Sequence, residues 1–206
     1  MVMLGLGVFN GPSYLGSDER KTRALPLIDA RWRNGWFAGT RGIGYRLDTG
    51  TPFSGGVRLT VDRGRDEDDA DALRGMGDIK ARPELGMFVN YKLTPQLDLG
   101  SSFRYGSGND REGILADISL RGTHPITPSN RLVGGLTMTL ANTKSMQNTF
   151  GVDAAQSLSS GYAPYSPGSG LRNVQLQIGN MTMLRPNTML FIRVDARRLM
   201  GDAKDS

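Results

Sequence analysis

The sequence contains no cysteine among its 206 residues. This absence excludes disulfides, thiolate metal sites and cysteine nucleophiles, and it suits a compartment where free thiols would be oxidised. Long apolar runs are also missing: hydrophobic residues make up only 38% of the chain, and no segment approaches the roughly 18–20 apolar residues of a membrane-spanning helix. A helical membrane protein is therefore excluded, but a barrel of alternating strands is not.

The chain has a single histidine, His124. Every Ser-His-Asp or histidine–metal scheme would have to use this residue. His124 stands beside Pro125 in a predicted short turn, Thr123 to Asn130, away from the long polar links where an outer-membrane protease or lipase would need it. We expect a non-enzymatic protein without a cofactor, in which alanine at His124 leaves function intact.

Positive charge is in modest excess. The 25 Lys and Arg residues exceed the 20 Asp and Glu residues and give a net charge of +5. However, the basic residues are spread singly, without the block of Lys and Arg or the aromatic–basic motif that nucleic-acid binding favours. We expect no nucleic-acid partner.

The chain does show apolar and polar residues that alternate with a period of two. Ile114, Ala116, Ile118 and Leu120 fall on one face of a strand, and polar residues occupy the other. The same pattern recurs and predicts ten strands, over 3–10, 24–33, 36–47, 55–63, 84–93, 96–105, 112–122, 131–141, 173–184 and 187–199. A β-sandwich would show similar alternation, so the periodicity does not choose between sandwich and barrel.

The lengths of the connections favour a transmembrane barrel. Short links at 93–96, 123–130 and 185–187 alternate with longer polar links at 64–83, 106–111 and 142–172. Outer-membrane barrels have short turns on the periplasmic side and long loops outside. Counting back along this pattern places Met1 on the outer side, which is wrong for a single-chain barrel. We therefore predict that 36–47 breaks at its glycines into two short strands.

Charged residues on the polar faces are the candidate site. They are expected to line the barrel lumen, either as an open pore or as salt bridges that fill the interior, and the even mixture of signs favours filling. The candidate lumen-lining residues are Asp98, Arg104, Asp117, Arg121, Arg193, Asp195 and Arg197.

Three features of the predicted connections have two interpretations each. The acidic stretch Asp66 to Asp71 offers carboxylates to calcium, but it lacks the EF-hand spacing, so a solvated loop neutralised by Arg63, Arg65 and Arg74 is preferred and no metal site is assigned. Tyr162 and Tyr165 are either an exposed recognition surface or, as we prefer, packed onto the barrel mouth. Trp32 and Trp36 are either core residues or part of an interfacial aromatic girdle.

Motifs in the connections resemble one family over nearly the whole chain. In order, the motifs are Leu4–Val8, Pro12–Asp18, Leu25–Asp29, Gly64–Asp69, Leu73–Asp78, Phe150–Val152, Ser160 with Gly161, Tyr165, Arg198–Ala203 and Asp205 with Ser206. Together they resemble the MipA/OmpV family of MltA-interacting outer-membrane proteins.

The resemblance implies an all-β, antiparallel transmembrane β-barrel in the outer membrane of a Gram-negative cell, with about 10–12 strands in the full protein. One barrel domain would occupy residues 1–206, in contact with outer-membrane lipid. Some relatives join a murein-cleaving lytic transglycosylase to a murein synthase, which implies a scaffold for peptidoglycan-remodelling enzymes. Others are associated with porin-like, adhesin or antibiotic-response roles, so a channel or ligand-binding barrel for small solutes is the alternative.

Two departures from the family pattern concern the ends of the chain. No signal peptide precedes Leu4–Val8, and the chain stops at Ser206, where relatives continue into a closing strand. An open strand edge is not tolerated in hydrocarbon. We therefore expect a fragment that lacks the signal peptide and the last strand, so that its barrel is incomplete at the C-terminus.

Overall fold

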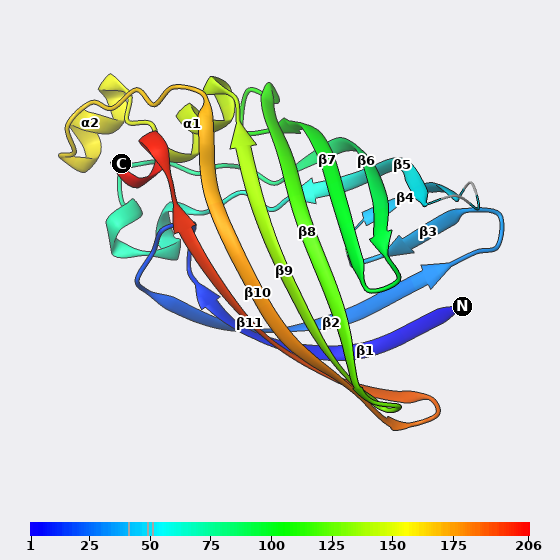
Figure 1. Cartoon of the computed structure of the whole chain (residues 1–206). Coiled ribbons are helices and arrows are strands. Elements are labelled where there is room, and N and C mark those ends of the chain that lie inside the picture. The colour runs from blue at the N-terminus through cyan, green and yellow to red at the C-terminus, as the bar shows by residue number, and fades with distance from the viewer. Residues whose placement is uncertain (41, 49, 51) are drawn as a thin grey trace.

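The structure, a computed structural model, describes residues 1–40, 42–48, 50 and 52–206. It is all-β, with one antiparallel sheet of 11 strands that pair in chain order. The strands are β1 (Val2–Pro12), β2 (Arg20–Arg31), β3 (Trp36–Gly39), β4 (Gly42–Asp48), β5 (Phe53–Asp62), β6 (Arg82–Thr94), β7 (Leu97–Ser107), β8 (Gly113–Thr127), β9 (Asn130–Ala141), β10 (Gly170–Arg185) and β11 (Thr188–Leu199). The sheet curls on itself with β1 and β11 as its edges, which gives an open, barrel-like fold (Figure 1). The predicted fold class is confirmed.

The predicted break within 36–47 is also confirmed. β3 ends at Gly39 and β4 begins at Gly42, and the two short strands pair with each other. Gly42 has a φ of 112°, which only glycine adopts without strain, so the glycine allows the chain to reverse there. The extra strand places Met1 at the end of the sheet that carries the short turns, where its amino group donates to the Arg31 carbonyl at 2.8 Å.

The predicted turn over 123–130 is wrong in its extent. β8 continues to Thr127 and pairs through His124 and Pro125 with the start of β9, so that only residues 128–129 form the turn. The ladder shifts register between Pro125 and Thr127, and such an irregularity accommodates a residue without a backbone N–H. Proline therefore lies within the hairpin rather than ending it.

The faces of the sheet are inverted relative to those of a soluble protein. On β6, Leu85, Met87 and Val89 are 62%, 57% and 52% exposed, whereas Glu84 on the other face is 2% exposed. The alternation continues across the neighbouring strands and puts apolar side chains on the convex outside and polar side chains inside. The described part of the chain contains no helix that is long and apolar enough to cross a membrane.

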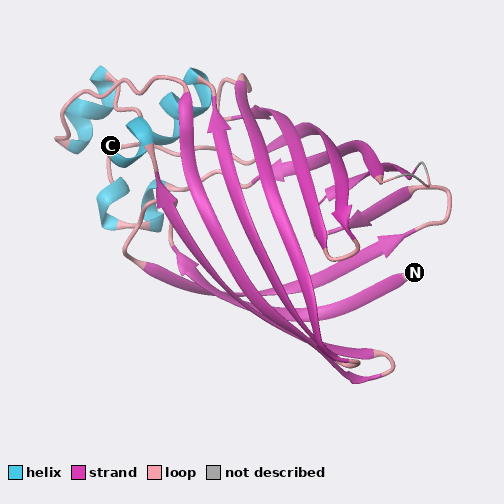
Figure 2. Cartoon of the chain, in the orientation of Figure 1, coloured by secondary structure: helices cyan, strands magenta, loops and turns pink. Residues whose placement is uncertain are grey.

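The long links fold into a cap at one end of the sheet (Figure 2). The link 142–169, predicted as a long polar link over 142–172, contains α1 (Thr143–Phe150) and α2 (Ala154–Ser160). Asn142 and Asp153 begin these helices by accepting hydrogen bonds from Ser145 and Gln156. Short 3-10 turns at Glu67–Asp69, Asp71–Leu73 and Gly201–Lys204 complete the cap.

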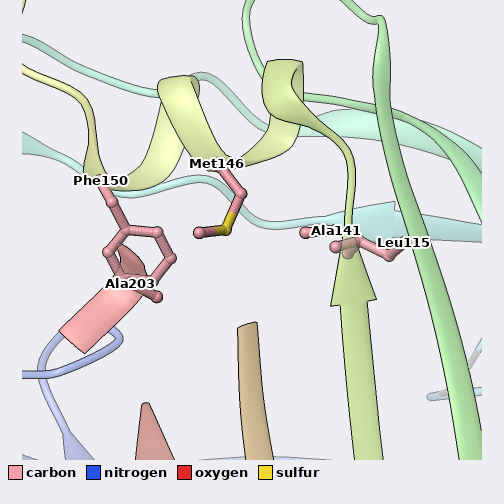
Figure 3. Close-up of a cluster of buried hydrophobic side chains, with 5 residues drawn as sticks. All are labelled: Leu115, Ala141, Met146, Phe150 and Ala203. Carbon is pink, nitrogen blue, oxygen red and sulfur yellow. The ribbon is translucent and has the colours of Figure 1, made fainter. Parts of the chain in front are cut away.

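The cap has a small conventional core. Met146 is 1% exposed and packs with other buried side chains at the top of the sheet (Figure 3). The cluster consists of Leu115, Ala141, Met146, Phe150 and Ala203. Residues from four parts of the sequence thus hold the cap on the sheet.

Alanine at Met146 should loosen the cap. The lost apolar contacts and the resulting cavity cost about 2–5 kcal/mol in a fully buried position, and we expect faster amide hydrogen exchange in α1 while the sheet stays protected. Leu158→Ala in α2 is the control, because Leu158 is 90% exposed. Equal exchange in the two variants would contradict the packing described.

Candidate functional site: the polar interior and its cap

The strand registers bring charged side chains of the inner face into one row. Asp117 on β8 lies opposite Ser102 on β7 and Thr139 on β9, and Glu84 on β6 lies opposite Thr60 on β5. In its strand, each of these residues stands directly beside outward-facing residues, most of them apolar. Successive side chains of a strand point to opposite faces, so these residues point inward. The row therefore crosses five neighbouring strands.

Arg104 is the centre of this row. Its Nη2 lies 3.1 Å from Oδ2 of Asp117, and its Nη1 lies 3.6 Å from Oε2 of Glu84. Thr139 donates to the other Asp117 oxygen at 2.8 Å, and Thr60 donates to Glu84 at 3.2 Å. The guanidinium thus joins two carboxylates, each of which also accepts a hydrogen bond from a threonine hydroxyl.

The charged side chains of the row depend on one another because they are buried. The side chain of Glu84 is 3% exposed, and those of Asp117 and Arg104 are 18% and 23% exposed. A charge removed from water is costly unless it is paired and hydrogen-bonded. Loss of one member would therefore leave a buried charge without its partner.

A second cluster of predicted residues lies on β10 and β11. Arg193 donates to Asp195 at 2.9 Å, and Gln175 donates to the other Asp195 oxygen at 3.2 Å. Arg197 donates to the Gln175 carbonyl at 2.8 Å. The side chains of Arg193, Asp195 and Arg197 are thus linked through one glutamine.

The other two predicted residues lie towards the short turns. Arg121 donates to Asn90, while Asp98 faces Arg121 across the β7–β8 ladder. Among the described residues, no hydrogen bond or ion pair joins the Asp98 side chain to another residue. The structure therefore brings the seven candidates into three separate groups, with only Arg104 and Asp117 in the central row.

Sequence reasoning missed Glu84, which is the most buried charge of the row. It stands at the first residue of the predicted strand 84–93, where alternation is hardest to assign. Its position directly before the outward-facing Leu85 was the sequence feature that could have placed Glu84 on the inner face. Thr60, Thr139 and Gln175 were missed because uncharged polar residues are common on either face of a strand.

The acidic stretch of the cap is used in structural contacts. Asp69 binds Lys21 at 2.8 Å and lies 3.9 Å from Arg23, both from β2, whereas Asp71 pairs with the predicted Arg74. The hydrogen bond from Lys21 holds the pKa of Asp69 below its ordinary value. No group of three or more potential ligand side chains suited to a metal ion occurs among the residues the structure describes.

Tyr162 and Tyr165 are tied into the cap, in agreement with the preferred interpretation. The Tyr162 hydroxyl donates to the Ala72 carbonyl at 3.1 Å, and the Tyr165 hydroxyl donates to the Asp202 carbonyl at 2.7 Å. These contacts join the link 142–169 to the 3-10 turns on either side of it. His124 lies in β8 near the opposite end of the sheet.

The fold and this site define a class: an open, barrel-like antiparallel sheet with an apolar outside, a charged and hydrogen-bonded inside, and a cap at one end. A family model described as MltA-interacting protein MipA matches residues 4–206. The chain belongs to the MipA family, which confirms the resemblance drawn from the motifs. No curated protein and no solved structure matches the chain.

Alanine at Asp117 should destabilise the sheet strongly, because Arg104 then keeps a buried charge with a single distant partner. We expect a loss of about 2–4 kcal/mol in the free energy of unfolding, somewhat less than for a fully buried pair. Asp71→Ala is the control, since Asp71 and Arg74 are 83% and 77% exposed and such pairs contribute about 0–1 kcal/mol. Urea unfolding of the folded protein measures both, and equal losses would refute the dependence of the row on Asp117.

Proposed function

We propose that the chain forms a single outer-membrane barrel domain of a Gram-negative envelope and acts as a non-enzymatic scaffold for peptidoglycan-remodelling enzymes. The partners would be a lytic transglycosylase and a murein synthase. The observation that carries the scaffold role is membership of a family described as MltA-interacting over residues 4–206. The inverted faces of the sheet support the place in the membrane.

An apolar exterior with polar residues inside is the arrangement that lipid demands of a barrel. Exposed aromatic side chains support the same placement, because such residues concentrate at the two membrane interfaces. Trp32, Trp36 and Phe53 are each about half exposed near the short turns, and Tyr105 is 47% exposed towards the cap. The Trp32–Trp36 pair thus fits an interfacial girdle.

We also propose that the seven charged candidates line the interior of this barrel. Six of them have hydrogen-bond or ion-pair partners within the sheet, on the same strand or at most two strands away. Side chains held in this way favour a filled interior over an open pore. The alternative is a channel or ligand-binding barrel for small solutes, favoured by the presence of a polar cavity beneath the cap.

The membrane placement predicts that charge on the outer face is harmful. Val89→Arg near the middle of β6 should cost about 2–4 kcal/mol in lipid vesicles, although Val89 is 52% exposed. Leu158→Arg is the matched control, because Leu158 is exposed on the cap and outside the sheet. A neutral effect of Val89→Arg on unfolding in lipid would contradict a lipid-facing position.

The scaffold role predicts capture of a lytic transglycosylase from envelope extract by the folded protein. The exposed Arg131 and Arg185 flank the short turns of β8–β9 and β10–β11, which would face the periplasm. We expect Arg131→Glu with Arg185→Glu to reduce capture about tenfold, while Lys144→Glu on the cap leaves it unchanged. A clean negative from the unaltered protein, with steady ion-selective steps in a bilayer, would favour transport instead.

A further inference from the structure

A cavity of about 270 Å³ lies beneath the cap. Its wall is formed by the turn after β1, the link that follows β5, the end of β7, α1 and the start of β10. Nothing in the scaffold role uses this space. At roughly 30 Å³ for each water molecule, the cavity holds the equivalent of about nine waters, which suits a small solute better than a drug-sized ligand.

Positive charge dominates the lining. Arginines 63, 65, 104 and 172 line the cavity, together with two carboxylates, Asp62 and Glu84. Arg104 is already shared between Glu84 and Asp117. Within the described part of the chain, Arg65 and Arg172 form no ion pair, so the cavity has a cationic excess.

The hydrogen bonds of these two arginines leave donors available. Arg65 Nη1 donates to the Thr149 carbonyl at 3.2 Å, and its buried Nε has no partner among the described residues. Arg172 Nε donates to the Asn173 side chain at 3.0 Å. A guanidinium carries five N–H donors in a fixed fork, so most donors of both residues remain unassigned.

Ser107 gives an independent indication of a ligand. It is 4% exposed and lines the same cavity, and its Oγ has no hydrogen-bond partner in the described residues. A buried hydroxyl without a partner is uncommon in folded proteins and calls for an explanation. Water could satisfy this hydroxyl, but water would not neutralise the two arginines.

We propose that the cavity binds a small solute through an oxyanion, a carboxylate or a phosphate group. Arg65 and Arg172 would bind its oxygens with charge-assisted hydrogen bonds, and the Ser107 hydroxyl would donate a hydrogen bond to the same group. Arginine is suited to this task because its planar fork matches the geometry of both oxyanions. The site lies beneath the cap, at the opposite end of the sheet from the turns assigned to the scaffold, so either proposal can fail without the other.

Isothermal titration calorimetry of the folded protein in detergent tests the site, with inorganic phosphate and succinate as separate probes at constant ionic strength. We expect saturable binding of at least one probe, and the stronger probe identifies the oxyanion class. Arg172→Gln and Arg65→Gln should each weaken binding at least about tenfold, which corresponds to the loss of about one charge-assisted contact. Arg193→Gln is the control, because Arg193 pairs with Asp195 away from the cavity.

Ser107→Ala provides a second variant that removes a hydroxyl without changing charge. It should weaken binding several-fold and preserve the fold, so it tests the site even where an arginine variant does not fold. The proposal would be overturned if the unaltered protein showed no saturable binding up to about 10 mM probe. This limit corresponds to a binding free energy of about −3 kcal/mol. Equal weakening by Arg193→Gln would also overturn the proposal, because binding would then follow overall charge.

Discussion

The register of the central strands is the constraint on which the rest of the structure depends. Leu85 faces Tyr105 across β6 and β7, and Phe103 faces Ala116 across β7 and β8, so the outward positions of this region are apolar with the exception of Ser101. A shift of one residue would exchange the faces of a strand. It would place Arg104 outside and leave Glu84 buried without its cation. The ion pairs and the apolar exterior therefore select the same register.

The protein has two interiors of different chemistry. Along the sheet the buried side chains are polar and satisfy one another, whereas in the cap the buried side chains are apolar and surround Met146. Leu115 marks the transition, since it stands on the inner face of β8 two residues before Asp117 but belongs to the cap cluster. The inner face of β8 thus changes from charged to apolar within two residues. This change anchors the cap on the strands that carry the central row.

Alternation and connection length were sufficient to predict the strands, because both reflect constraints on short segments. The break between β3 and β4 followed from the glycines and from the need to place Met1 at the correct end. The row through Arg104 could not be predicted, because Glu84, Arg104 and Asp117 meet only once three strands are aligned. The helices α1 and α2 were not predicted because both are short. Burial of Met146 and Phe150 against the sheet stabilises α1 more than its own propensity does, whereas α2 has no buried residue.

The two ends of the sheet serve different physical roles, and this division bears on function. The short-turn end is built from tight hairpins, in which Asn130 and Asn180 exchange side-chain hydrogen bonds between β9 and β10. Such a rigid end suits the docking of a partner, because little ordering is required on binding. The cap end is joined by contacts from distant segments, including the Tyr165 hydroxyl bond to Asp202. The arginine-lined cavity lies beneath the same cap. The proposed solute site and the proposed docking end thus lie at opposite ends of the sheet, so the two proposals are compatible in one chain.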